Sequence, residues 1–191
     1  MPNHVSNRLE IRCEDKVAMD KIKELIFKKV RKNKVAFTME KMLPRPKSRS
    51  NQSQFDDYWY YWNISVWGTK WDVYDVDISE NSDNSIIIYY TTAWSINYLW
   101  IETLCNFINN WIRSKTTLWD LEITILYRCY CYYSDFGGSL EWSPGMKVDI
   151  KRYDFMDYCE LYMRETYNEL LGIEKEDNAT NGFVGSFSLY F

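Results

Sequence analysis

The chain has 191 residues and a formal net charge of −4; 46% of its residues are hydrophobic, 26% charged and 18% aromatic. This length suits one domain, and the balance of apolar and charged residues excludes wholesale disorder. The apolar runs are only a few residues long and the N-terminus lacks the apolar core of a secretory signal, so we expect a cytosolic protein that does not span a membrane.

The first half of the chain predicts more strands than helices. Aromatic and β-branched residues favour strands, whereas apolar residues at helical spacing, such as Met19, Ile22, Ile26 and Val30, favour a helix. In chain order, we expect a strand over residues 5–13, a helix over 15–32, a short strand over 35–39, a polar loop over 47–54, and strands over 58–66, 71–78 and 86–92. The strands 58–66 and 71–78 are expected to pair about a turn at 67–70.

The second half of the chain continues the same mixture of elements. Ser95 is the expected N-cap, and Trp100, Leu104, Ile108 and Trp111 form an apolar stripe after it. We expect a helix over residues 96–113, a strand over 121–127, a hairpin of 136–142 with 146–153, a helix over 155–171 and a strand over 183–191.

This order of elements predicts an α+β fold. Strands outnumber helices and short hairpins join them, which favours a mostly antiparallel sheet with the helices packed on one face. We expect a single domain over residues 1–191, with a core over 1–145 and a C-terminal hairpin–helix–strand elaboration over 146–191.

Signatures of common enzymes are missing from the sequence. The chain has one histidine, His4, no glycine-rich phosphate loop and no G-x-S-x-G elbow. Its five cysteines are an odd number in an expected cytosolic protein, which favours free thiols over a disulfide framework. We therefore predict a protein that is not an enzyme and that holds no cofactor and no metal.

Several motifs resemble one known family. The chain contains, in this order, Met1-Pro2-Asn3-His4-Val5-Ser6-Asn7-Arg8-Leu9, Leu43-Pro44-Arg45-Pro46, Trp67-Gly68-Thr69-Lys70-Trp71-Asp72 and Thr91-Thr92-Ala93-Trp94-Ser95. Together they resemble the YubB-like ferredoxin-fold family of phage- and plasmid-encoded proteins, over residues 1 to about 145. The chain departs from that family at His4-Val5, where the family has Trp-Cys, and at Ile96-Asn97, where it has Pro-Pro. The resemblance implies a ferredoxin-like core and a mobile-element origin, and it implies no enzymatic activity.

Two aromatic segments are candidates for binding a partner. In residues 67–72, Lys70 lies near two tryptophans, a pattern that suits cation–π contacts at the edge of a pocket, although the same indoles could instead cover the core. In residues 58–62, every side chain is Tyr or Trp, so the faces are either both buried or partly exposed as a contact surface. The predicted partner-binding residues are Trp59, Tyr61, Trp62, Trp67, Lys70 and Trp71.

A basic segment lies in the N-terminal part of an acidic chain. Residues 15–49 have a net charge of +8 and residues 50–191 a net charge of −12. Contact with RNA or DNA phosphates would use Lys28, Lys29, Arg31, Lys32, Lys34, Arg45, Lys47 and Arg49. The alternative is a solvated helix end whose cations complement the helix dipole.

A third possibility is an enzyme of unfamiliar type. Asp72, Asp75 and Asp77 could hold a cation, and His4 could act in acid–base chemistry. Alternating acids are more typical of the solvated face of an antiparallel strand.

These observations lead to one leading hypothesis and two alternatives. The leading hypothesis is a non-enzymatic, phage-type protein in the cytoplasm of a bacterial host that binds and inhibits a defence complex. Its most concrete form is an anti-CRISPR protein that acts on a Cas nuclease or on guide RNA loading. The alternatives are a nucleic-acid-binding accessory protein of a plasmid or phage, and the enzyme described above.

Overall fold

A computed structural model describes residues 3–31, 34–46, 58–115, 121–131 and 136–154. They belong to one compact unit, residues 1–158; a second unit, residues 159–191, lies outside the described residues. The elements are β1 (His4–Cys13), α1 (Lys16–Ile26), β2 (Phe27–Arg31), β3 (Lys34–Phe37), α2 (Met39–Met42), α3 (Tyr58–Val66), β4 (Tyr74–Asn81), β5 (Ser85–Ala93), α4 (Tyr98–Arg113), β6 (Ile123–Cys131), β7 (Phe136–Trp142) and β8 (Lys151–Asp154).

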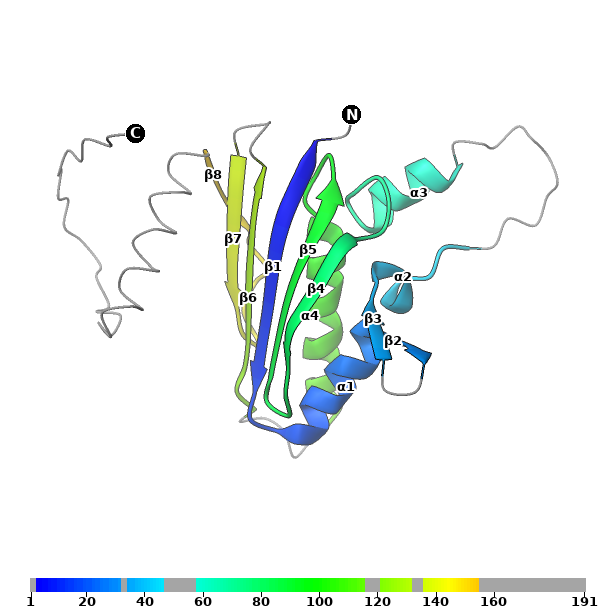
Figure 1. Cartoon of the computed structure of the whole chain (residues 1–191). Helices are drawn as coiled ribbons and strands as arrows, with labels where there is room; N and C mark the ends of the chain where they lie inside the picture. Colours follow the sequence, from blue (N-terminus) through cyan, green and yellow to red (C-terminus); the bar gives the residue numbers. More distant parts are fainter. Residues whose placement is uncertain (1–2, 32–33, 47–57, 116–120, 132–135, 155–191) are drawn as a thin grey trace, which may run out of the picture. The chain divides into compact units, whose positions relative to one another are not determined.

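A six-stranded sheet is the centre of the unit. Its strand order is β4-β5-β1-β6-β7-β8, and every neighbouring pair is antiparallel. A separate antiparallel ribbon consists of β2 and β3. In Figure 1, α1 and α4 lie on the same side of the sheet. The predicted α+β class and mostly antiparallel sheet are therefore confirmed.

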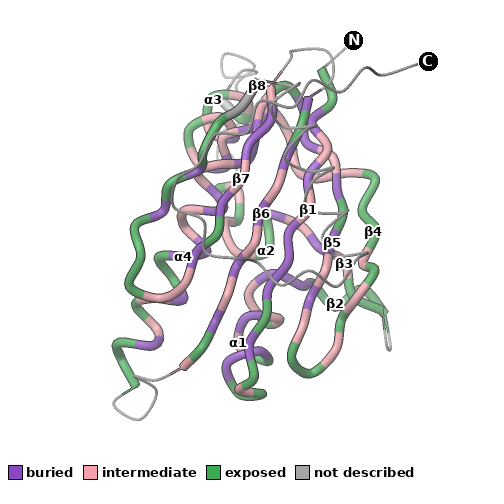
Figure 2. Tube along the Cα trace, turned by 90° about the vertical axis from the view of Figure 1, so that its left-hand side faces the viewer, coloured by how far each residue is buried: buried purple, intermediate pink, exposed green. Residues whose placement is uncertain are grey.

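The hydrophobic core lies between the sheet and these helices. On β1, Val5, Leu9 and Ile11 are completely buried, and they alternate with residues that point to the other face. On the predicted stripe of α4, Trp100, Leu104 and Ile108 are buried in the same core cluster, and Trp111 is partly buried against it. Figure 2 shows how burial alternates along the central strands, whereas the edge strand β4 is exposed or half-buried along its whole length. The core thus consists of apolar residues that recur at every second position in the strands and at helical spacing in the helices.

A buried polar network ties the central strands to α4. The Tyr127 hydroxyl donates to Asn7 Oδ1 at 2.6 Å and lies 3.1 Å from Asn97 Oδ1, while Asn97 also bonds to the Tyr90 hydroxyl. Asn97, and not the predicted Ser95, occupies the N-cap position of α4. Because buried polar groups need partners, this network favours one specific packing of the strands against the helix.

The first predicted helix is too long. α1 ends at Ile26, and the chain then turns into the β2–β3 ribbon, in which Phe27 lies opposite Phe37. Val30, which we expected on the apolar stripe, is 58% exposed. The buried pair of phenylalanines therefore favours the ribbon over a continuation of the helix, although the apolar spacing favours the helix.

The strand predicted over residues 58–66 is also wrong, because this segment is the helix α3. Strand β4 consequently pairs with β5 and not with residues 58–66. The β-propensity of Tyr and Trp misled the prediction, since such preferences depend strongly on packing.

Other predictions agree more closely with the structure. The pairing of β7 with β8 confirms a hairpin in this region, but its second strand begins at Lys151 and not at the predicted residue 146. The four cysteines in the described part of the chain are buried free thiols, as expected. The predicted helix over 155–171 and strand over 183–191 lie outside the described residues. Among the helices that are described, none is both long and apolar enough to cross a bilayer.

Candidate partner-binding site

The site is built around the loop that follows α3. Gly68 has a φ of +82°, a backbone conformation that side-chain-bearing residues rarely adopt, and a Cβ there would lie 3.2 Å from the Ile96 carbonyl oxygen. The Thr69 hydroxyl is buried and donates to the Ala93 carbonyl at 2.8 Å. These contacts fasten the loop to the connection between β5 and α4.

Asn63 fixes the same loop from the side of α3. Its carbonyl oxygen accepts from the backbone N–H groups of Trp67 (2.8 Å) and Gly68 (3.2 Å). Its side-chain amide donates to the Lys70 carbonyl at 2.6 Å. Asn63 is fully buried, so the helix end and the loop form one rigid unit.

Trp94 is held on the surface in a strained conformation. Its φ is +71° and its side chain is 44% exposed. Its backbone N–H donates to the Asn3 carbonyl at 2.8 Å, and the next residue, Ser95, donates its hydroxyl to the Gly68 carbonyl at 2.5 Å. A left-handed conformation costs a non-glycine residue about 1–2 kcal/mol. The surrounding hydrogen bonds therefore keep the backbone of Trp94 in an unfavourable conformation, in which its indole is exposed to solvent.

Lys70 lies between two indoles. Its ammonium nitrogen is 4.0 Å from the centre of the Trp94 ring and 5.0 Å from that of the Trp71 ring. Contacts of this kind contribute about 0.5–1 kcal/mol at exposed sites. Lys70 is thus a positioned cation on an aromatic surface.

The aromatic side chains form a continuous series of contacts. Tyr60 contacts Trp59, Tyr61 and Trp94, with ring centres 6.0, 5.5 and 6.4 Å apart. We call the following six residues the ring cluster: Trp59, Tyr60, Tyr61, Lys70, Trp71 and Trp94.

A pair of residues extends the ring cluster towards β1. Trp71 lies 6.4 Å from Tyr74, whose hydroxyl is 2.6 Å from Nδ1 of the exposed His4. Burial, and to a smaller extent the Asp75 charge, raise the pKa of Tyr74, so its phenol stays protonated at neutral pH.

Four of the six predicted partner-binding residues belong to the ring cluster, and two do not. Trp67 is completely buried and donates its indole N–H to the Leu43 carbonyl at 3.1 Å. Trp62 packs against Trp67, with ring centres 5.2 Å apart, and against the core. Trp67 is corrected from a partner-binding to a core position, because an inward-facing indole that is already hydrogen-bonded offers no contact surface. Trp62 is only partly buried and lies beside Trp67, outside the ring cluster.

Sequence reasoning missed Tyr60 and Trp94. Tyr60 was within the aromatic segment, but a strand pattern placed it away from Trp59 and Tyr61, whereas the helix brings all three into contact. Trp94 was noticed only as part of a family-like motif. No pattern in the sequence predicts the positive φ of Trp94.

The acidic candidates do not converge. Asp72 accepts hydrogen bonds from the Thr38 hydroxyl (2.5 Å) and from the backbone N–H groups of Met39 (2.8 Å) and Val73 (2.8 Å), which makes it an anchor for the start of α2. Asp75 and Asp77 are exposed on β4, where the pairing with β5 is irregular. In the described ranges, no three His, Cys, Asp or Glu side chains gather as metal ligands would.

The basic candidates are divided among three places. Lys28, Lys29, Arg31 and Lys34 are exposed on the β2–β3 ribbon, so the alternative of a solvated helix end is wrong. Arg45 is half-buried, with its guanidinium 5.6 Å from the centre of the Trp67 ring, and it lies apart from the ribbon. Lys32, Lys47 and Arg49 lie outside the described residues.

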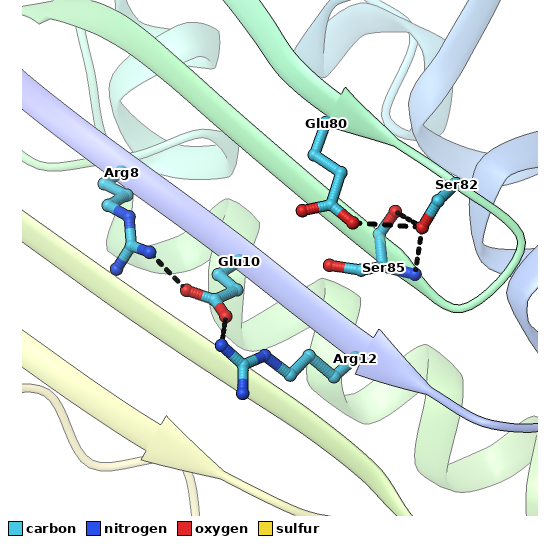
Figure 3. Close-up of polar contacts among 6 residues, drawn as sticks. All are labelled: Arg8, Glu10, Arg12, Glu80, Ser82 and Ser85. Atoms are coloured by element: carbon cyan, nitrogen blue, oxygen red, sulfur yellow. Dashed lines mark hydrogen bonds and ion pairs between the residues drawn. The ribbon is translucent and has the colours of Figure 1, made fainter. Parts of the chain in front are cut away.

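The sheet face opposite the helices holds a charge cluster that the sequence did not reveal. Glu10, only 1% exposed, forms ion pairs with Arg8 and Arg12, each at 2.5 Å (Figure 3). Buried ion pairs are costly to desolvate, so each arginine offsets the cost of burying this carboxylate. Alternation in a strand could have placed the three residues on one face, but it could not predict that Glu10 is covered.

Comparisons of the chain with protein-family models, with curated proteins and with solved structures give no match.

Proposed function

We propose that this chain is a non-enzymatic binding protein that docks its ring cluster on a protein partner. The observation that carries the proposal is the unbroken series of aromatic contacts from Trp59 through Tyr60 to Trp94, with Lys70 held between Trp94 and Trp71. Trp and Tyr dominate the energetics of protein interfaces, because they bury a large area at a small cost in side-chain entropy.

The exposure of these side chains supports a binding role. Tyr61 is 67% exposed, Trp94 44% and Trp59 37%, so large apolar surfaces face the solvent together. Such contiguous surfaces are typical of interaction sites. The strained backbone of Trp94 strengthens the argument, because strain of this kind is typically kept where it serves a function.

The partner in this proposal is a bacterial defence complex, most concretely a Cas nuclease or its guide-loading step. That choice rests on the resemblance to a family of phage and plasmid proteins, which would place the protein in the cytoplasm of a bacterial host. A ferredoxin-like core, which the same resemblance implies, is supported by the element order β1-α1-β4-β5-α4-β6, with β2, β3, α2 and α3 inserted between α1 and β4, together with the strand order β4-β5-β1-β6.

The enzyme alternative finds less support in the geometry. Asp72 is engaged by the start of α2, and His4 pairs with Tyr74 and not with a carboxylate among the described hydrogen bonds. Acid–base or cation chemistry would need some of these groups to converge on one position.

The decisive experiment compares variants of the purified full-length protein in an inhibition assay. DNA cleavage by bacterial Cas nuclease–guide complexes is titrated with the wild type, with Trp59→Ala/Trp94→Gly, and with the control Tyr89→Ala/Phe107→Ala. The control residues are 44% and 39% exposed, which matches the exposure of Trp94 and Trp59, but neither belongs to the ring cluster.

We expect the wild type and the control to inhibit cleavage, and the ring-cluster variant to need at least about 30-fold more protein, equivalent to about 2 kcal/mol for a hot spot. Equal inhibition by the two variants, with native melting curves, would contradict a role for the ring cluster. If no Cas nuclease is inhibited, a partner is captured from a bacterial host, identified by mass spectrometry and used in a binding assay in place of the nuclease. A directly measured affinity that is insensitive to the ring-cluster variant would then refute the proposal.

A further inference from the structure

The β2–β3 ribbon is a strongly charged surface that the proposed function does not use. Lys28, Lys29, Arg31 and Lys34 are all exposed, and the ribbon is separate from the six-stranded sheet. Among its described residues, 27–31 and 34–37, there is no acidic side chain. The ribbon therefore presents four positive charges on two short strands.

The root of the ribbon is fixed in the core. Phe27 and Phe37 lie opposite each other and are 6% and 3% exposed. The Phe37 ring contacts Tyr90 and Trp100, with ring centres 5.0 and 5.5 Å apart. Because its first residue pair is buried, the ribbon is anchored at one end and carries its charges at the other.

The charges of the ribbon are not neutralised within the described ranges. The ion pairs observed there use Arg8, Arg12, Lys16 and Lys21, none of which belongs to the ribbon. One carboxylate lies nearby, Glu24, but it pairs with Lys21 at 2.8 Å. The pKa of Glu24 is lowered, mainly by Lys21 and to a smaller extent by Lys41 and Lys29. Positive potential therefore dominates this part of the surface.

We infer that the β2–β3 ribbon binds the phosphodiester backbone of a nucleic acid through Lys28, Lys29, Arg31 and Lys34. A two-stranded ribbon fits a major groove about 12 Å wide, and Lys and Arg side chains on it reach phosphates. The exposed residues of the described ribbon include no aromatic ring on which bases could stack. Because the inferred contacts are with phosphates, which are the same in every sequence, we expect binding that is independent of sequence. This inference goes beyond the proposed function, which concerns a protein partner.

An anionic membrane surface would be the competing ligand for such cations. Stable membrane binding normally adds buried apolar area to electrostatic attraction. On the exposed part of the ribbon, the apolar side chains are Val30 and Val35, which are 58% and 38% exposed and small. The ribbon thus offers charge with little apolar surface, which favours phosphates in a groove.

The test measures fluorescence anisotropy of labelled duplex DNA, duplex RNA and single-stranded RNA with the full-length protein. Wild type is compared with a variant in which Lys28, Lys29, Arg31 and Lys34 are all replaced by Gln. The matched control replaces four exposed cations elsewhere with Gln, namely Arg113, Lys115, Lys147 and Lys151. Melting curves establish that all three proteins are folded.

We expect wild type and control to bind at 50 mM salt, with a log–log salt slope of about −3.6 on duplex DNA if four phosphates are contacted. The ribbon variant is expected to bind at least about 10-fold more weakly and with a flatter slope. The comparison of the three probes identifies the preferred nucleic acid. Trp59→Ala/Trp94→Gly is expected to bind nucleic acid like wild type, which separates this inference from the proposed function.

Three results would overturn the inference. The first is the absence of binding to every nucleic acid probe at 50 mM salt. The second is an equal loss of affinity in the ribbon variant and the matched control, which would show a general charge effect. The third is binding to vesicles of anionic phospholipid, lost in the ribbon variant, without binding to nucleic acid.

Discussion

Five of the nine tryptophans of this chain fall into two groups that differ in their surroundings. Trp67, Trp100 and Trp142 are completely buried, and each donates its indole N–H to a backbone carbonyl, of Leu43, Met39 and Met146 respectively. Trp59 and Trp94 are more than a third exposed, and no indole hydrogen bond joins them to the described part of the chain.

The comparison shows that residue type alone does not separate core from contact surface. A buried indole needs a partner for its N–H, and each core tryptophan of this group has one. An exposed indole can leave its N–H to water, or to another molecule. The pairing of the N–H group thus distinguishes the tryptophans that hold the fold from those available for binding.

The largest difference between the two groups of tryptophans is expected when a core tryptophan is truncated. Trp100→Ala removes a fully buried ring and leaves the Met39 carbonyl without its indole donor, so we expect a loss of about 3–5 kcal/mol in the free energy of unfolding. Urea unfolding followed by circular dichroism measures it. Trp59→Ala, the surface counterpart, is expected to change stability by less than about 1 kcal/mol; equal losses in both variants would erase the distinction.

Alkaline pH tests the interior without a mutation. Burial raises the pKa of the Cys105 and Cys129 thiols from 9.0 to about 12, and it raises that of Tyr90 as well. Since the unfolded chain loses these protons first, stability is complete below about pH 9 and falls as the pH rises from 9 towards 12. Each thiol lowers the free energy of unfolding by up to about 1.4 kcal/mol per pH unit between pH 9 and 12.

Urea midpoints measured from pH 7 to 11 check this expectation. A control variant, Cys105→Ala/Cys129→Ala, is expected to show a shallower decline above pH 9. Midpoints that do not change up to pH 11 would show that the thiols titrate alike in the folded and unfolded chains.

A smaller effect is expected at the loop that supports the ring cluster. Asp72→Ala removes the acceptor for the Met39 N–H and the Thr38 hydroxyl, and we expect a loss of about 1–2 kcal/mol in the free energy of unfolding. Asp72→Asn keeps one acceptor oxygen and should lose less. Thermal unfolding of both variants measures the difference, and a wild-type melting temperature in Asp72→Ala would contradict the anchoring role.

The smallest effect on stability is expected at Trp94. Trp94→Gly relieves about 1–2 kcal/mol of strain at the positive φ, but it loses the Lys70 contact and costs about 0.5–1 kcal/mol of backbone entropy. The terms nearly cancel, so the free energy of unfolding should stay within about 1 kcal/mol of wild type. Trp94→Ala keeps the strain and should be less stable than Trp94→Gly; the opposite order in urea unfolding would refute the account of strain.

Much of the fold could be predicted from the sequence because its main periodicities are unambiguous. The alternation in β1 and β6, the β-branched and aromatic residues of β5 and the apolar stripe of α4 predicted the right elements. The prediction failed where tertiary contacts override local preference. Phe27 ends α1 by pairing with Phe37, and α3 is helical although nearly all its residues favour strands.

The candidate site was less predictable than the fold. Lys70 and Trp71 were found from a local motif, but the contact of Trp94 with Lys70 joins two segments that are distant in the sequence. Trp67 belongs to the same motif as Lys70 and points into the core. No local pattern separates these two neighbours, because their directions are set by Gly68 and by the hydrogen bonds of Asn63.

The central position of β1 has a consequence for how the protein is made. This strand pairs with β5 and β6, and the hydrogen bond between Asn7 and Tyr127 joins residues 120 positions apart. At about 5–20 residues per second of translation, β1 waits roughly 6–24 s for β6 to be synthesised. The edge of β1 that pairs with β5 stays unpaired until residues 85–93 have been made, and the edge that pairs with β6 stays unpaired for the whole interval. Nascent chains that stall before β6 should therefore be prone to aggregation and should depend on chaperones that shield an unpaired strand edge.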